Sequence, residues 1–309
     1  MNENSDLQKT EIYRFDGKLL DILLLDRSSK KNLIWATDHY ASRGRGYQAS
    51  DNITRRAIFG RSGSIIKPRV EKSPKDQTSR VKDKAEVFTP SWICNAQNNL
   101  VDNAWFGRAN VFNTETEKGW LANSEKITFP EKKTWQDYVK ENRLEITCGE
   151  APYLVSRYDA VSGKMIAVKE RIGLLDRKLR IVSENADSEK EWFEWAKAAY
   201  KSVYGFDWQG DNVFLARENL LCTFIDYFTN KFGIAPAHDF LLEIAEIISW
   251  NIWQMDGLKY VIPSGGEPHS KRQPHSGKGE SGKQTDIYCV IKDWERKKNI
   301  KFASLVSLK

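Results

Sequence analysis

The segment from Leu144 to Pro152 constrains the fold of this chain more than any other stretch. It has the pattern of a short apolar strand carrying Glu145 near its end, followed by Thr147-Cys148-Gly149 and by Ala151 at the start of a helical stretch. Gly149 and Ala151 let the backbone approach a ligand closely, and Glu145 can accept hydrogen bonds from a hydroxyl or an amine. The segment is therefore typical of the loop that binds a nucleotide-type cofactor.

Two later segments repeat the pattern of a strand that ends in an acid, at Asp207 and at Asp256. Ligands of open α/β sheets bind outside the carboxyl ends of the strands, so we expect Glu145, Asp207 and Asp256 to line one crevice. Ionised carboxylates only accept hydrogen bonds, which suits an amine, ribose hydroxyls and the adenine amino group. The alternative interpretation is that each acid begins a turn or caps a helix.

The rest of the chain is organised around this pattern. Apolar runs at 19–25 and 32–36 predict two strands, or one helix and one strand, in an N-terminal segment 1–60. Residues 61–84 are rich in Lys and Arg and predict a basic linker, either a solvated connector or a clamp on DNA phosphates. Further expectations are helices at 90–102, 189–203, 211–230 and 239–248, a flexible loop at 264–285 and a fourth strand at 286–291.

Composition bounds the classes of function. The net charge of +6 is compatible with DNA as a partner. The four cysteines are far apart and form no CxxC pair, which predicts reduced thiols, a cytoplasmic location and no metal site. No apolar run approaches the length needed to cross a bilayer, so we expect no membrane partner.

Five segments follow one another in the chain: Phe88-Thr89-Pro90, Glu145 to Ala151, Tyr204 to Asp207, Ala216 to Leu220, and Asp256-Gly257-Leu258. This order, over roughly residues 85–260, resembles that of the adenine-N6 DNA methyltransferases, above all the modification subunits of bacterial restriction systems. It implies an α/β chain with a Rossmann-like, S-adenosylmethionine-dependent methyltransferase fold over 85–309, preceded by an N-terminal extension and interrupted by insertions.

The resemblance also implies roles for the matched residues. Phe88 and Thr89, in the segment that Pro90 completes, would close over S-adenosylmethionine. Glu145 and the Thr147-Cys148-Gly149 loop would meet its methionine part. Asp207 would hold the ribose with Trp208 beside the adenine, and Asp256, followed by Gly257, would accept from the adenine amine. Two positions depart mildly from the family: Ile146 stands where it usually has Pro, and Ala151 where it usually has Gly.

The Asn/Asp-Pro-Pro-aromatic motif that methylates the flipped base has no counterpart, because no two of the nine prolines are adjacent. Three explanations remain open. Asp293 and Trp294 could replace the motif after the fourth strand. Asp38 and Tyr40 could replace it in a permuted order, with the N-terminal runs completing the sheet. A second protein subunit could supply the catalytic and target-recognition parts. The alternative function is an inactive DNA- or cofactor-binding subunit of a restriction or phage-defence system.

Overall fold

A three-stranded parallel sheet lies at the centre of the computed structural model, which describes residues 17–60, 63–74, 77–78, 89–263 and 286–306. The strand order is β7-β8-β9, with bounds β7 (Arg143–Ile146), β8 (Val203–Asp207) and β9 (Ile252–Gln254). Glu145 lies opposite Gly205, and Phe206 lies opposite Trp253. The described chain is thus mixed α/β with a parallel sheet, as the strand-end acids predict.

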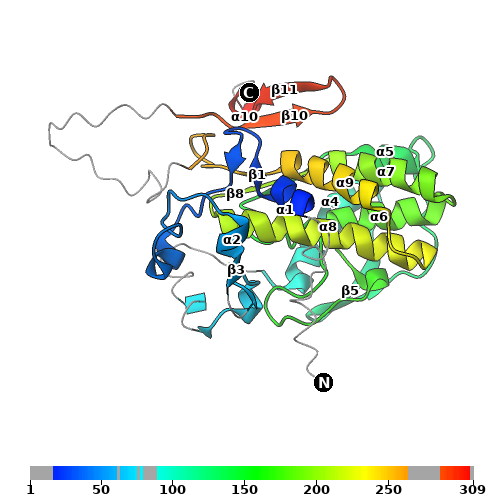
Figure 1. Ribbon diagram of the computed structural model, residues 1–309. Coiled ribbons are helices and arrows are strands. Elements are labelled where there is room, and N and C mark those ends of the chain that lie inside the picture. The colour runs from blue at the N-terminus through cyan, green and yellow to red at the C-terminus, as the bar shows by residue number, and fades with distance from the viewer. Residues whose placement is uncertain (1–16, 61–62, 75–76, 79–88, 264–285, 307–309) are drawn as a thin grey trace.

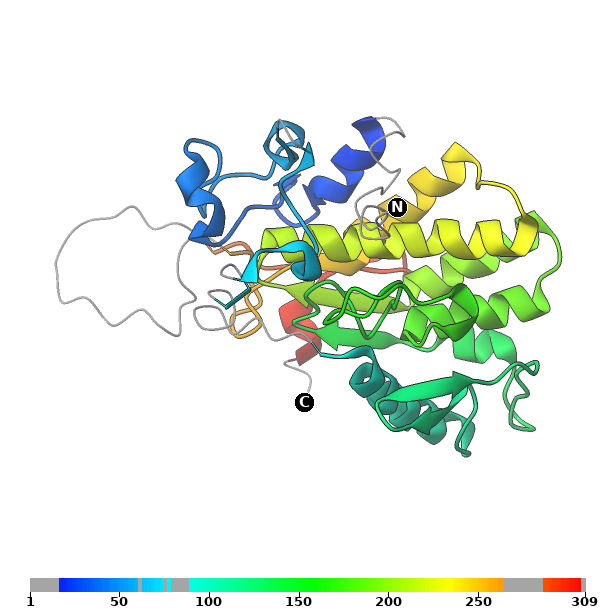
Figure 2. The same cartoon turned by 90° about the horizontal axis from the view of Figure 1, so that it is seen from below.

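Helices pack the main core on one face of this sheet. They are α1 (Gly17–Leu24), α6 (Leu174–Asn185), α7 (Glu189–Lys201), α8 (Gly210–Phe232) and α9 (His238–Asn251). Figure 2 shows α8 running along the strands with α9 beside it. The predicted start of α7 and the predicted end of α8 agree with the structure: the Ser188 hydroxyl accepts from the amide of Glu191 at the start of α7, and Gly233 ends α8 with φ 72°.

A C-terminal hairpin covers part of the other face. It consists of β10 (Val290–Asp293) and β11 (Lys298–Lys301), followed by α10 (Phe302–Val306), and Figure 1 shows it on the side of β8 away from α8. Phe206, Trp253, Ile291 and Phe302 form a second, smaller core there. The predicted fourth strand is therefore corrected: it begins at Val290, and it pairs antiparallel with β11 instead of joining the parallel sheet.

Residues 91–140, which precede β7 in the chain, form a third group of elements. Helix α4 (Ser91–Phe106) packs with the hairpin of β5 (Asn113–Thr116) and β6 (Gly119–Ala122), and α5 (Trp135–Lys140) packs on α6. The region 103–140, which has an irregular sequence pattern, therefore contains ordered elements. The short 3-10 helix η5 (Val168–Glu170) precedes α6 in the chain and packs against β6 of this group.

The N-terminal runs form one helix and a short hairpin, in line with the helix-and-strand alternative rather than with two strands. Leu19, Leu20, Leu23 and Leu24 are buried along one side of α1, because their spacing matches a helical turn. The elements that follow are β1 (Leu25–Asp26), β2 (Lys31–Asn32), η3 (Asp38–Arg43), α2 (Arg55–Ile58), β3 (Phe59–Gly60), β4 (Gly63–Ser64) and η4 (Arg69–Glu71). Among the helices in the described ranges, none combines the length and the hydropathy needed to cross a membrane.

Candidate functional site

A tight bend follows β7 at the carboxyl edge of the parallel sheet. Thr147, Gly149 and Ala151 all adopt the left-handed region, with φ of 51°, 53° and 63°. Glycine adopts this conformation at no cost, whereas the β-branched Thr147 stores strain of order 1–3 kcal/mol. The amide of Cys148 donates to the carbonyl of Phe206 (2.8 Å), which fixes the bend to β8. Strain of this kind is typical of backbone held in place around a site.

Asp207, the last residue of β8, holds the bend directly. Its Oδ2 accepts from the amide of Gly149 at 3.0 Å, and its Oδ1 accepts from the amide of Gln209 at 2.8 Å. The carboxylate is largely buried, at 7% exposure. Asp207 and the Cys148-Gly149 bend, which are far apart in the sequence, therefore form one unit, as the strand-end pattern predicts.

Glu145 lies on the helix-facing side of β7 and is also buried. Its carboxylate oxygens accept from the amides of Tyr153 (3.3 Å) and Leu154 (3.1 Å). Burial, together with a smaller effect of nearby Asp207, raises the pKa of Glu145 to about 8 against the lowering effect of these two amides. Glu145 is therefore largely protonated at neutral pH and holds the loop that follows the bend, in keeping with the turn-forming interpretation of this acid.

Asp256 lies at the same edge but organises its own turn. Its Oδ1 accepts from the amides of Leu258 (2.8 Å) and Lys259 (3.1 Å). Gly257 lets this turn pack on the sheet, since a Cβ there would lie 3.2 Å from the Phe206 ring. The amide of Met255 donates to the carbonyl of Asp207 (3.0 Å), which keeps the turn against β8. The three acids thus share one sheet edge, and each is bonded to backbone amides.

Residues 33–36 lie beside β9 at this edge. Gln254 binds the backbone of Ile34 twice, as acceptor from its amide (3.1 Å) and as donor to its carbonyl (2.9 Å). The indole of Trp208 donates to the carbonyl of Ala36 (3.2 Å). Residues 33–36 are therefore attached to β9 by the side chain of Gln254, and not by backbone hydrogen bonds of the kind that join two strands. The only sequence signal for Gln254 is a polar residue within an apolar strand.

Tyr40, a residue of η3, contacts the first turn of α8. Its hydroxyl donates to Oδ2 of Asp211 at 3.0 Å, and Nζ of Lys72 lies 3.7 Å from the same oxygen. Asp38, two residues earlier, is exposed. Because Asp211 follows Asp207 by four residues, the structure brings Tyr40 to the carboxyl edge of the sheet, while the Asp38 side chain faces solvent.

The described part of the predicted basic linker packs against the bend. The amide of Arg69 donates to Glu150 (2.6 Å), which also accepts from the Tyr158 hydroxyl (2.7 Å). Asn219 of α8 donates to that hydroxyl and to the carbonyl of Glu150, both at 3.0 Å. The described part of the predicted linker is thus attached to the bend at Arg69, and its role as a connector or as a clamp on DNA stays a prediction.

Helix α4 supports the loop after the bend. Pro90 is the N-cap of α4, the Cys94 thiol donates to the carbonyl of Thr89 (3.7 Å), and Asn98 donates to the carbonyl of Tyr153 (2.9 Å). Thr89 and Pro90 are therefore joined through α4 to the loop that Glu145 holds. Phe88, the other residue of the predicted Phe-Thr-Pro segment, lies outside the described residues.

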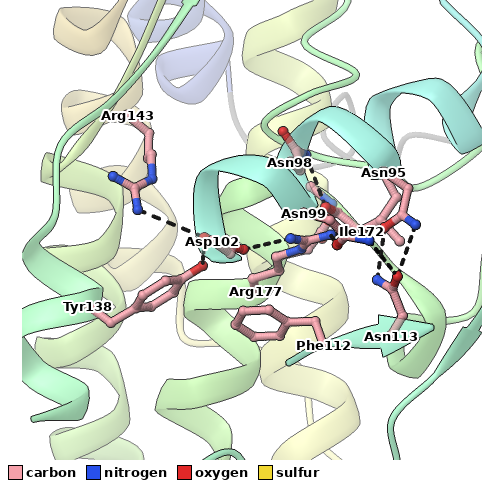
Figure 3. A network of polar contacts seen from close by, with 12 residues as sticks. Asn95, Asn98, Asn99, Asp102, Phe112, Asn113, Tyr138, Arg143, Ile172 and Arg177 are labelled. Carbon is pink, nitrogen blue, oxygen red and sulfur yellow. Dashed lines mark hydrogen bonds and ion pairs between the residues drawn. The ribbon is translucent and has the colours of Figure 1, made fainter. Parts of the chain in front are cut away.

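A buried guanidinium fixes α4 to α6 (Figure 3). Arg177 donates to Asp102 (2.6 Å), Asn95 (2.9 Å) and Asn99 (2.7 Å), and its guanidinium lies 5.0 Å from the centre of the Phe112 ring. The three acceptors lie on one face of α4, because their spacing follows the helical period. This network sets the position of α4, and through Asn98 the position of the loop.

Asp293 and Trp294 lie at the opposite end of the sheet. The Trp294 indole donates to Asn251 (2.8 Å), whose amide group donates to the carbonyl of Val203 (3.0 Å) at the beginning of β8. Asp293 lines a cavity of about 540 Å³ there, together with Lys201 and Tyr204. The structure therefore does not bring Asp293 and Trp294 to the bend, which lies beyond the far end of β7.

The chain matches no known protein family, no curated protein and no solved structure.

Proposed function

We propose that the chain is a restriction-modification-associated DNA adenine-N6 methyltransferase-like protein that binds S-adenosylmethionine at the carboxyl edge of its parallel sheet. The observation that carries the proposal is the hydrogen bond from the Gly149 amide to Asp207 (3.0 Å). It joins the loop and the acid that the resemblance assigns to the methionine and ribose parts of one ligand. The order β9-β8-β7 also agrees with one half of a Rossmann-like sheet, with the bend after its first strand.

The residues at this edge fit such a cofactor. S-adenosylmethionine, when bound, supplies a methyl group on a positively charged sulfur. Asp207 and Asp256 offer acceptor oxygens for ribose hydroxyls and an adenine amine, and Gly149 offers close backbone approach. Trp208 lies beside Asp207 with its indole fixed to Ala36, so its ring position is set in advance. The carboxyl group of Glu145 holds the loop and stays largely protonated at pH 7.

Methyl transfer also needs a group that accepts hydrogen bonds from the adenine amine and an aromatic ring for the flipped base. Tyr40 is the aromatic candidate that the geometry favours over Trp294, since its hydroxyl reaches Asp211 just after β8. Asp38 is the paired acid, and its exposure leaves it accessible to DNA. The second candidate function is a cofactor- or DNA-binding subunit without methyl transfer, and the absence of adjacent prolines favours it.

Calorimetry with S-adenosylmethionine tests the cofactor site. We expect the full chain to bind the cofactor, and Asp207→Asn to weaken binding at least about ten-fold, equivalent to roughly 1.4 kcal/mol. Asp187→Asn is the matched control, because this fully exposed carboxylate is removed by the same chemical change. Thermal unfolding of each variant separates a lost contact from a lost fold. Absence of binding by the wild-type chain would overturn the proposal.

Transfer of a labelled methyl group to DNA distinguishes the two candidate functions. An active enzyme predicts labelled adenine that is lost in Asp38→Ala and reduced in Tyr40→Phe, with Asp293→Ala close to wild type. Loss of labelling in Asp293→Ala alone would instead assign the reaction to the other end of the sheet. Cofactor binding without labelling on any DNA favours the binding subunit.

A further inference from the structure

The cavity of about 540 Å³ beside the amino ends of β7 and β8 has a largely apolar lining. The apolar side chains come from α7, the three parallel strands are represented by one or more residues each, and the C-terminal hairpin and α10 complete the wall: Leu144, Ala198, Trp253, Ile291, Phe302 and Leu305. Leu144 and Leu305 are 45% and 46% exposed, so the cavity keeps apolar surface open. Its size falls in the range of about 300–1,000 Å³ that is typical of sites for small organic molecules.

Two ammonium groups that line this cavity approach the same indole ring. Nζ of Lys292 lies 4.6 Å and Nζ of Lys201 lies 5.3 Å from the centre of the Trp294 ring. Within the part of the chain that the structure describes, neither lysine forms an ion pair with a carboxylate. Burial, together with the like charges of Lys197 and Lys292, lowers the pKa of Lys201. A negative group bound between the two lysines would offset this repulsion.

The acids of the cavity do not neutralise these cations. Asp293 is bonded within its own turn, where its Oδ1 accepts from the amide of Arg296 (2.9 Å) and its Oδ2 lies 3.9 Å from Nε of that residue. Glu295 is exposed. Lys140 of α5 also lines the cavity, so three lysines face two acids there. The charge of the lining is therefore complementary to an anion.

The Tyr204 side chain adds a hydrogen-bond donor to the same cavity. Its hydroxyl forms no hydrogen bond with another described residue. Burial, with the nearby acids Asp293 and Glu295, raises the pKa of Tyr204 to about 12, so the hydroxyl keeps its proton at neutral pH and can donate it to an anion. Few other polar groups line the cavity, which suits an apolar body better than a nucleobase with its several donors and acceptors.

We propose that this cavity binds an amphipathic organic carboxylate, with its apolar body against Leu144, Phe302 and Leu305 and its negative group held by Lys201 and Lys292. The body is aliphatic or aromatic, and the shared chemistry is a single carboxylate on an apolar group. The site lies at the end of the sheet opposite the Cys148-Gly149 bend. The inference therefore goes beyond the proposed function and does not depend on it.

Calorimetry of the full chain with four probes tests the chemical class. Decanoate and 2-naphthoate carry a carboxylate on an aliphatic and an aromatic body, decyltrimethylammonium carries the opposite charge, and adenosine monophosphate joins an anion to a nucleobase. We expect at least one carboxylate to bind saturably, and the other two probes to bind at least about ten-fold more weakly. The better carboxylate identifies the body. Absence of binding by both carboxylates, or equal binding of decyltrimethylammonium or adenosine monophosphate, overturns the proposal.

Substitution of the two lysines locates the binding. Lys201→Gln and Lys292→Gln should each weaken binding of the better carboxylate at least about ten-fold, because a charge-assisted hydrogen bond is lost. Lys197→Gln is the matched control on α7, since Lys197 pairs with Glu194 (2.9 Å) and Glu243 (3.0 Å) outside the cavity, and it should stay within about two-fold of wild type. Thermal unfolding confirms that each variant is folded. Equal affinities of wild type and both cavity variants would place the binding elsewhere and contradict the proposal.

Discussion

At the scale of single residues, the acids of the candidate site act on the protein backbone. The Asp207 carboxylate accepts a hydrogen bond from the amide of Gly149. The Glu145 carboxyl group accepts from the amides of Tyr153 and Leu154, and Asp256 accepts from amides of its own turn. A residue that positions a loop and a residue that binds a ligand look the same in the sequence, because both are acids at strand ends. The sequence could therefore place these acids at one edge, while only the structure distinguishes their partners.

Glu145 gives the free energy of unfolding a predictable dependence on pH. Its pKa is about 8 in the folded chain against an ordinary 4.5, so between these pH values the folded chain holds a proton that the unfolded chain releases. The contribution is fully present below pH 4.5, declines as pH rises and is lost above pH 8. We expect a loss of roughly 3–5 kcal/mol across this range from Glu145.

Glu145→Gln isolates this contribution, because an amide has no proton to lose in the range. Urea unfolding at pH 5 and pH 9 should show a smaller decline for the variant, whose stability at pH 9 equals or exceeds that of wild type. Buried Asp176, with a pKa raised to about 6, adds a decline of the same sign in both proteins and cancels in the comparison. Identical declines would show that Glu145 does not carry the raised pKa.

At the scale of elements, the helices and the parallel strands follow from local patterns, and the polar core between α4 and α6 does not. The Ser188 cap, the apolar period of α7 and the terminal Gly233 are local signals. Arg177 meets Asp102 across 75 positions of sequence, and both side chains are 1% exposed. A row of Asn and Asp on one face of a helix normally indicates a solvated face, so no local signal predicts this burial.

Arg177→Met should destabilise the protein strongly. The change leaves Asp102 buried with the Tyr138 hydroxyl (2.8 Å) and the more distant Arg143 (3.8 Å) as its neighbours, and breaking a buried pair in this way costs about 3–5 kcal/mol. Arg180→Met is the comparison on the same helix: its partners are Glu184, one turn away and partly exposed, and the carbonyls of Phe112 (3.4 Å) and Glu125 (2.9 Å), so its loss leaves no buried charge behind and should cost less than that of Arg177.

A double-mutant cycle tests whether the pair itself is responsible. Adding Asp102→Asn to Arg177→Met should recover part of the lost stability in urea unfolding, because the uncompensated charge is removed together with its partner. Additive losses would indicate that packing against Phe112 determines the effect of Arg177 instead.

At the scale of the whole molecule, contacts between distant segments decide what the sequence leaves open. Periodicity alone cannot distinguish a short buried strand from a short helix, and α1 forms a helix because α8 and α9 offer a surface for its leucine side. The C-terminal strand likewise forms a hairpin because Ile291 and Phe302 bury their apolar side chains against Trp253 and Phe206 on the second face of the sheet. The strand-end acids were predictable, because parallel strands share one carboxyl edge; the attachment of the N-terminal segment to that edge through Gln254 was not.

This attachment depends on a glycine at the beginning of α8. A Cβ at Gly210 would lie 2.0 Å from the carbonyl oxygen of Ile34, which is backbone and is itself held by Gln254 at 2.9 Å. We therefore expect Gly210→Ala to move residues 33–36 away from the sheet edge, although alanine normally favours a helix by up to about 1 kcal/mol. Limited proteolysis should cut within 38–48 faster in this variant, with a lower midpoint of thermal unfolding.

Gly233→Ala is the control for a glycine change on the same helix. The φ of 72° at Gly233 strains alanine, but a Cβ there meets no other atom, so this variant should lower stability without exposing 38–48. Equal cleavage rates in the two variants would mean that the N-terminal segment is held by α1 alone and that the carboxyl edge, with Tyr40, is not closed by this contact.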